Sequence, residues 1–135
     1  MSTDLNLNML IDEQLIKNIN PATYAFVGDA VYTLFVRMEL AKIPRPSKEL
    51  HTSSVEYVKA TAQAKAYEII KEMLTETEEA IYKRGRNFHT NNTPKNASNA
   101  EYHSATGLET LFGYLYLTNN IDRAKELFAI IWQSI

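Results

Sequence analysis

An aspartate in the middle of an otherwise apolar helix constrains this chain more than any other feature. Between Pro21 and Ile43 most residues are small, aliphatic or aromatic, and Asp29 lies near the middle of that segment. The residues three and four positions away, its neighbours on a helix, include no lysine or arginine. Burying an unpaired carboxylate is costly or makes it take up a proton. Gly28 lowers the stability of the helix by about 1 kcal/mol relative to alanine. We expect that close approach of another backbone at Gly28 offsets this loss.

The remaining pattern predicts an all-α fold, because no useful length of sequence alternates apolar and polar residues as a half-buried strand does. Asn20 and Pro21 start the first long helix, and Pro44 with Pro46 ends it. We expect a short helix within residues 1–19 and a long one from an N-cap at Ser47 to Leu74, with a kink or division at Ser53–Ser54. Capping boxes predict the next two helices, one from Thr75 and Glu78 to Arg86 and one from Ser98 and Glu101 to about Thr118. A last helix is expected after Asn119–Asn120. A chain of 135 residues is predicted to form one domain, residues 1–135.

Composition excludes several classes of protein. The chain has no cysteine, so it has no disulfide, no thiolate metal site and no cysteine nucleophile. Residues 1–10 lack the basic and apolar regions of a secretory signal, and no apolar run approaches the roughly 20 residues that cross a bilayer. We therefore expect a soluble, cytoplasmic protein with no membrane partner.

A second carboxylate repeats the pattern of the first. Glu109 lies on the helix predicted from Ser98, with Gly113 one turn later and no lysine or arginine three or four positions away. Two converging carboxylates need a cation between them, and a hard divalent ion such as Mg²⁺ takes a few oxygen ligands plus water. The alternative is that each carboxylate caps a loop or reaches solvent at the edge of its helix.

The distribution of charge gives another signal. The formal net charge is −2, which by itself argues against a nucleic-acid partner. Between Glu79 and Glu101, however, no residue is acidic, whereas four are basic: Lys83, Arg84, Arg86 and Lys95. Such a segment indicates either a surface for phosphate groups or a solvated helix end whose cations complement the helix dipole.

Two motifs resemble the catalytic domain of the ribonuclease III family. The run from Phe26 to Val31 (FVGDAV) is similar to the family signature, and the run from Ser104 to Leu115 (SATGLETLFGYL) resembles its second catalytic helix. Smaller motifs narrow the resemblance to Mini-ribonuclease III, the short bacterial branch that lacks a double-stranded-RNA-binding domain. They are Leu50-His51 with Ser53, Val58-Lys59-Ala60 with Gln63-Ala64, Lys83 to Asn87 (KRGRN), and Thr93 to Asn96 (TPKN). The resemblance covers roughly residues 20–118.

This resemblance implies a homodimeric endoribonuclease with a ribonuclease III-type helical bundle. It would use Mg²⁺, with Mn²⁺ as a substitute, to cut double-stranded RNA, and its usual role is to mature the ends of the 23S ribosomal RNA precursor. A large-subunit ribosomal protein is a further candidate partner. Asp29 and Glu109 match the family's metal-binding carboxylates and are the expected catalytic residues. The expected RNA-binding residues are Lys83, Arg84, Arg86, Asn87, Thr93, Lys95 and Asn96.

The chain departs from classical members of the family at two positions. Those members have acidic residues four positions before the signature aspartate and three before the second-helix glutamate, where this chain has Ala25 and Thr106. The Mini-ribonuclease III branch resembles this chain in that respect, but the thinner ligand set leaves open whether one or two metal ions bind. A rival interpretation is a non-catalytic double-stranded-RNA-binding relative, and a third is an all-α protein-interaction module.

The predicted Asp29 helix carries more apolar side chains than one buried stripe requires. They are Phe26, Val27, Tyr32, Phe35 and Val36. A two-fold dimer would present two identical sites to the two strands of a duplex. We therefore expect part of this helix to be buried against a second copy near the two-fold axis, with Gly28 allowing the copies to approach closely.

Overall fold

The computed structural model describes residues 19–88 and 98–135, and the regular structure within these ranges is helical. Its elements are α2 (Pro21–Leu40), α3 (Ser47–Val58), α4 (Ala60–Ile70), a short 3₁₀ helix η2 (Lys71–Met73), α5 (Glu76–Arg86), α6 (Asn99–Leu117) and α7 (Ile121–Gln133). The predicted all-α class is confirmed. The helix expected within residues 1–19 falls almost entirely outside the described residues. None of the described helices is both long and apolar enough to cross a membrane.

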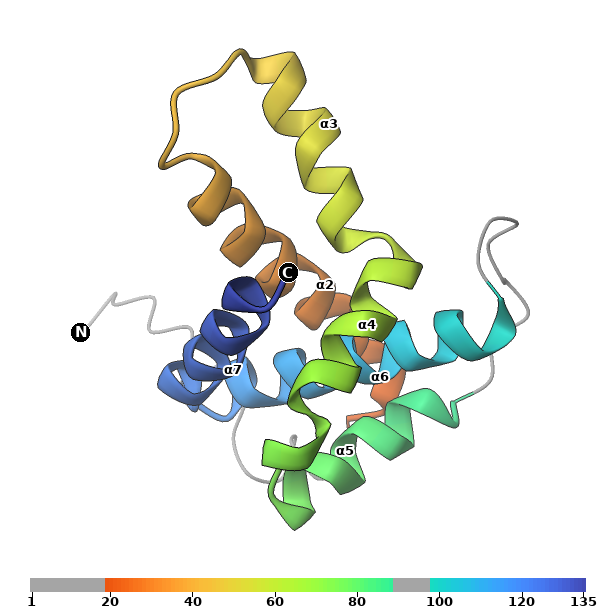
Figure 1. Ribbon diagram of the computed structural model, residues 1–135. Helices are drawn as coiled ribbons and strands as arrows, with labels where there is room; N and C mark the ends of the chain where they lie inside the picture. The colour runs from red at the N-terminus through yellow and green to blue at the C-terminus, as the bar shows by residue number, and fades with distance from the viewer. Residues whose placement is uncertain (1–18, 89–97) are drawn as a thin grey trace, which may run out of the picture.

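Helix α6 is the element around which the others pack. It contacts α2, α4, α5 and α7, and Figure 1 shows these helices arranged around it. Its side chains are buried on nearly all sides, as expected for a core helix, and Leu108, Leu111 and Phe112 are fully buried. The ring of Phe112 meets that of Tyr32 from α2 edge to face, with centroids 5.2 Å apart. A residue on α6 is therefore close to several other helices at once.

Two glycines bring the backbones of α2 and α6 into contact. A Cβ atom on Gly28 would overlap the carbonyl oxygen of Glu109, and one on Gly113 would overlap the carbonyl oxygen of Tyr24. The close approach expected at Gly28 is therefore confirmed. Its partner, however, is α6 of the same chain, so the prediction that Gly28 lies between two copies is wrong.

The outer face of α2 also differs from the prediction. Of the five apolar side chains expected to exceed the needs of the core, Tyr32, Phe35 and Val36 are buried within the chain's own core. Val27 is half-buried, whereas Phe26 is 80% exposed. More side chains of α2 are buried in the core than expected, because α6 and α7 both contact this helix.

Local signals in the sequence set the starts of three of the six described α-helices. The Asn20 side chain accepts a hydrogen bond from the backbone N–H of Thr23 at 3.0 Å and caps α2, with Pro21 at the first helical position. Both predicted capping boxes are present, at the starts of α5 and α6. The starts of these three helices are therefore confirmed.

Three predicted boundaries are wrong. Helix α2 ends at Leu40 rather than Ile43, because Pro44 disfavours a helical conformation for the residue before it. Ser47 is the first residue of α3, whose N-cap is Pro46 without a side-chain hydrogen bond. The division expected at Ser53–Ser54 occurs at Lys59, where the backbone is extended (φ −67°, ψ 159°).

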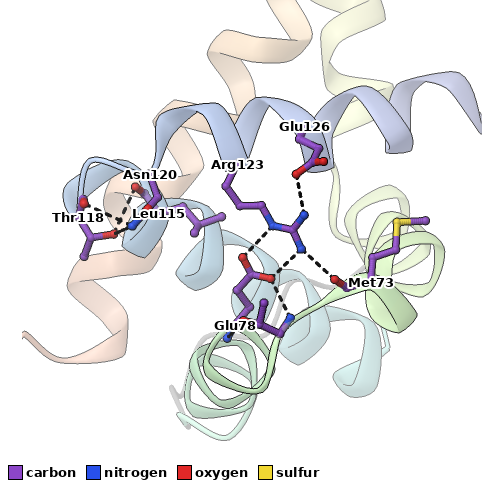
Figure 2. A network of polar contacts seen from close by, with 8 residues as sticks. Met73, Glu78, Leu115, Thr118, Asn120, Arg123 and Glu126 are labelled. Carbon is purple, nitrogen blue, oxygen red and sulfur yellow. Dashed lines mark hydrogen bonds and ion pairs between the residues drawn. The ribbon is translucent and has the colours of Figure 1, made fainter.

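A network of ionic hydrogen bonds joins α5 to α7 (Figure 2). Arg123 donates from Nε and Nη2 to the two carboxylate oxygens of Glu78, both at 2.9 Å, and from Nη2 to the carbonyl of Met73 at 2.8 Å. Burial pushes the pKa of Glu78 up, but hydrogen bonds from Arg123 and from the backbone of Thr75 outweigh it and hold that pKa below its usual value. This network fixes the start of α5, whose other end carries the basic residues.

Candidate active site

Asp29 and Glu109 lie side by side where α2 crosses α6. Gly28 touches the backbone of Glu109, and this contact brings the next residue, Asp29, to the same crossing. The two carboxyl groups are within hydrogen-bonding reach of each other. The structure therefore brings together the two carboxylates that the sequence singled out, although they are far apart in the chain.

The two carboxyl groups have different surroundings. Asp29 is exposed, whereas Glu109 is half-buried. Burial of the Glu109 carboxyl and the negative charge of Asp29 raise the pKa of Glu109 to about 8, the nearby amide of Gln63 lowers it, and a hydrogen bond with Asp29 raises it. The desolvation expected for the Asp29 carboxylate thus falls on Glu109. A divalent cation between the two groups would offset their repulsion.

The pair opens into a surface hollow of about 290 Å³ formed by α2, α6 and the residues after α5. Its lining residues are Ala22, Ala25, Phe26, Asp29, Phe88, Tyr102, Thr106 and Glu109. Ala25 and Thr106, which replace acidic residues of classical members, therefore border the same space. The Thr106 hydroxyl donates to the carbonyl of Tyr102 at 3.1 Å.

Asp29 and Glu109 are the residues here that could hold a metal ion. Within residues 19–88 and 98–135, no group of three or more histidine, cysteine, aspartate or glutamate side chains is arranged to do so. Two carboxylates suit Mg²⁺, which binds through one or two carboxylates and keeps several of its waters. The donor set fits a hydrated hard cation and does not fit zinc, which favours nitrogen and sulfur ligands.

The segment that follows α5 reaches this hollow. Phe88, two residues beyond Arg86, lines the hollow together with Asp29 and Glu109. Lys83 and Arg84, on the last turn of α5, are exposed. Phe88 therefore connects the end of the basic segment to this hollow, but no described lysine or arginine lines it, and Lys83 lines a separate hollow together with Glu72, Glu76 and Glu79.

Arg86 and Asn87 are tied to each other. Arg86 is half-buried, its guanidinium carbon lies 5.8 Å from the ring centroid of Tyr82, and its Nε donates to Asn87 Oδ1 at 3.1 Å. A guanidinium over an aromatic ring is stabilised by about 0.5–1 kcal/mol at an exposed site. Arg86 therefore has a packing role that Lys83 and Arg84 do not share. Thr93, Lys95 and Asn96, also predicted to bind RNA, lie outside the described residues.

Aromatic stacking and glycine contacts hold α5 in place. The ring of Tyr82 stacks on that of Tyr67 with centroids 3.6 Å apart, and its hydroxyl hydrogen-bonds with that of Ser104 on α6 at 2.8 Å. A Cβ on Gly85 would overlap the side chain of Thr110, and one on Gly107 would come within 2.6 Å of the Tyr82 ring. The two helices therefore pack closely, and the basic end is carried on a rigid element.

Sequence reasoning gave no role to three residues at or beside this site: Gln63, Phe88 and Tyr102. Gln63 lies on α4 with only 1% of its surface exposed. It shares a helical face with the buried residues Ala66, Tyr67 and Ile70. A polar residue at a core-facing position of this spacing was the signal that could have identified it. No comparable signal marked the other two.

Comparison with known proteins decides the family. Residues 22–120 match the model of the ribonuclease III domain. The Mini-ribonuclease 3 of Thermoanaerobacter sp. strain X514 is 40% identical over 127 residues, which cover 93% of this chain and 89% of that protein. The chain belongs to the Mini-ribonuclease III family. The Mini-ribonuclease 3 of Streptococcus pneumoniae strain R6 is also 40% identical, over 93% of this chain and 98% of that protein.

A solved structure shows the same fold. An X-ray crystal structure of a Fusobacterium nucleatum protein superposes with a TM-score of 0.81 at 28% sequence identity, over 88% of this chain and 96% of that chain. As a member of the Mini-ribonuclease III family, the chain is an endoribonuclease with a ribonuclease III fold. The family, the fold and the enzyme class predicted from the sequence are confirmed.

Proposed function

We propose that residues 1–135 form one catalytic domain, a Mg²⁺-dependent endoribonuclease that cleaves double-stranded RNA in the hollow containing Asp29 and Glu109. Its substrate is the 23S ribosomal RNA precursor, whose paired ends it matures in the cytoplasm, with Mn²⁺ able to replace Mg²⁺. The observation that carries the proposal is the meeting of two carboxylates from separate helices in a surface hollow, which Phe88, two residues beyond the end of α5, also lines. A large-subunit ribosomal protein on the precursor is a further proposed partner.

Asp29 and Glu109 hold the metal ion in this proposal, each through carboxylate oxygens. When bound, Mg²⁺ supplies Lewis-acid polarisation of the scissile phosphate and lowers the pKa of water for in-line attack. The small side chain of Ala25 leaves room in the hollow for metal-bound waters. The same pair argues against the non-catalytic alternative, because keeping the desolvated carboxyl of Glu109 beside the negative charge of Asp29 without a catalytic use destabilises the fold.

The duplex lies along the end of α5 in this proposal. A-form RNA is recognised mainly through its shape, its phosphates and its 2′-hydroxyl groups, which suits a basic surface without a base-reading motif. Lys83 and Arg84 are exposed and contact phosphates, while Arg86 is oriented by Tyr82 and Asn87. Asn87, Thr93, Lys95 and Asn96 provide further hydrogen-bond donors in the same proposal.

The working unit is proposed to be a homodimer formed through α2. Five side chains at four-residue spacing along this helix are apolar and exposed: Ala22, Phe26, Ala30, Leu34 and Met38. Phe26, Leu34 and Met38 are 80%, 50% and 54% exposed, which is unusual for large apolar residues on one stripe. Asp29 lies beside this stripe, so packing it against a second copy brings two sites together on one duplex.

Cleavage assays with matched variants test the proposed chemistry. The protein is expected to cut duplex RNA with Mg²⁺ and to stop when EDTA is added. Asp29→Asn and Glu109→Gln should lose cleavage and keep duplex affinity in EDTA, because each keeps the side-chain volume and removes a metal-binding charge. Asp122→Asn, an exposed change on α7 outside the hollow, is the control and should cut normally. Near wild-type cleavage by Asp29→Asn would show that the assigned centre is wrong.

A further inference from the structure

The side-chain Nε2 of Gln63 is buried without a well-formed hydrogen bond. Only 1% of this residue is exposed, and its Nε2 makes no hydrogen bond within the described part of the chain. Leaving a buried donor unpaired destabilises a fold, and native cores keep few such groups. An apolar residue of the same size would remove that destabilisation, so the amide needs a reason beyond packing.

The unpaired amide lies against the candidate active site. Gln63 is on the first turn of α4, where its backbone N–H bonds to the carbonyl of Lys59 at 3.0 Å, and α4 packs on α6. Its amide is close enough to the Glu109 carboxyl to favour the charged form of that group. The donor is therefore next to an acceptor with which it has no well-aligned hydrogen bond. Hydrogen bonds in active sites are often long or misaligned until the ligands are present.

The proposed metal site has few ligands, so a hydrogen-bond donor such as Gln63 Nε2 that orients one of them is useful. With Ala25 and Thr106 in place of carboxylates, no further acidic side chain on α2 or α6 fixes the orientation of Glu109 in this hollow. Groups that hydrogen-bond to a metal-binding carboxylate orient it, and their loss typically weakens metal binding by about 10- to 100-fold. Gln63 can supply that orientation from α4, a helix that carries neither carboxylate.

We propose that Gln63 is a positioning residue for Glu109. Its Nε2 donates to one oxygen of the Glu109 carboxylate, so that the other oxygen faces Asp29 and the divalent cation between them. This inference rests on the proposed metal-dependent function. It assigns a role to a third helix, α4, which contributes none of the metal-binding carboxylates.

Gln63→Met tests the proposal, because methionine has a similar length and no donor. We expect its thermal midpoint to equal or exceed that of the wild type, since an unpaired buried polar group is removed. Binding of Mn²⁺ to the protein alone, followed by the electron paramagnetic resonance signal of free Mn²⁺, should weaken about 10- to 100-fold. Cleavage should then need correspondingly more metal, while duplex affinity in EDTA stays unchanged.

Ser54→Ala is the matched control. Ser54 is a buried polar residue on α3 whose hydroxyl donates to the carbonyl of His51 at 2.8 Å, and it does not line the hollow. Its loss should leave Mn²⁺ affinity unchanged. A folded Gln63→Met with wild-type Mn²⁺ affinity would overturn the proposal. A large fall of the thermal midpoint in both Gln63→Met and Gln63→Leu would also overturn it, by assigning Gln63 a structural role. Failure of the wild type itself to bind Mn²⁺ or to cut duplex RNA would instead overturn the proposed function.

Discussion

Replacing Gly28 by alanine should push α2 and α6 apart at the candidate site. The added methyl group would overlap the carbonyl oxygen of Glu109 and lie 2.6 Å from its carbonyl carbon and 2.8 Å from the backbone nitrogen of Gly113. These atoms belong to the backbone, so no side-chain rotation can relieve the overlap. The helices must therefore move apart by a distance on the order of an ångström to restore ordinary contact.

The size of the effect follows from two opposing terms. Overpacking a well-packed core costs typically about 1–3 kcal/mol, and rigid backbone neighbours place this contact at the upper end. Alanine is better than glycine in a helix by about 1 kcal/mol, which offsets part of that cost. The net loss of folding free energy is then about 2 kcal/mol, which lowers the thermal midpoint by roughly 6–10 °C in a domain of this size. A displacement of about 1 Å between Asp29 and Glu109 should also reduce cleavage by up to about 100-fold.

Thermal unfolding and duplex cleavage measure these two effects separately. Unfolding should be compared at one protein concentration, because the midpoint of a dimer depends on concentration. Ala80→Gly, an exposed change on α5, is the matched control: it should lose about 1 kcal/mol through helix propensity alone and keep full activity. Two results together would contradict the prediction: a thermal midpoint of Gly28→Ala that is unchanged or raised, and cleavage by Gly28→Ala at the wild-type rate, measured at a temperature well below that midpoint.

Further predictions concern α5, its link to α7, and the dimer. Replacing Lys83 and Arg84 by alanine should lower the slope of log affinity against log salt by about 0.7–1 per lost phosphate contact, without changing the thermal midpoint; an unchanged slope places the RNA elsewhere. Arg86→Ala should in addition cost about 0.5–1 kcal/mol of stability, measured by denaturant unfolding, because it also loses a tyrosine ring contact. Arg123→Met should cost about 2–3 kcal/mol, less than for a fully buried pair because Arg123 is partly exposed. Folding lowers the pKa of Glu78. The stability that its carboxylate gives the fold is therefore present above the pKa of the unfolded state and is lost as the pH falls through the pKa of the folded state. Acidification from about pH 5 to about pH 3 should therefore lower the midpoint of the wild type more than that of Glu78→Gln. Light scattering at micromolar concentration should give about twice the 15.4 kDa chain mass, and a monomer that cuts both strands in one encounter contradicts the dimer.

Features that depend on a few neighbouring residues were predictable from the sequence. The cap at Asn20 and the capping boxes at Thr75 and Ser98 each satisfy backbone groups within one helical turn, so the sequence alone specifies them. The convergence of Asp29 and Glu109 was predicted by the resemblance of their two motifs to the ribonuclease III catalytic domain, whereas the apolar pattern around each carboxylate left open that it reaches solvent, as Asp29 does.

Features that depend on how helices pack against one another were not predictable in this way. The division at Lys59 has no glycine or proline to mark it; it lies where the chain passes from α3, which packs on α2, to α4, which packs on α6. The partner of Gly28 could have been another helix or a second copy, since the residue itself only provides space. Which aromatic residues of α2 are buried and which, such as Phe26, are exposed depends likewise on the positions of α6 and α7.

The arrangement of the site follows from the central position of α6. Glu109 meets Asp29 because Gly28 lets α2 touch α6, and it meets Gln63 because α4 packs on the same helix. Close packing at Gly85 holds α5 against α6, and Phe88, just beyond α5, lines the same hollow. In the proposed metal site, which has two carboxylates among the described residues lining the hollow, no additional acidic side chain there can compensate when one of these contacts shifts. Changes at the helix contacts should therefore reduce cleavage, by up to about 100-fold, even where the chain remains folded.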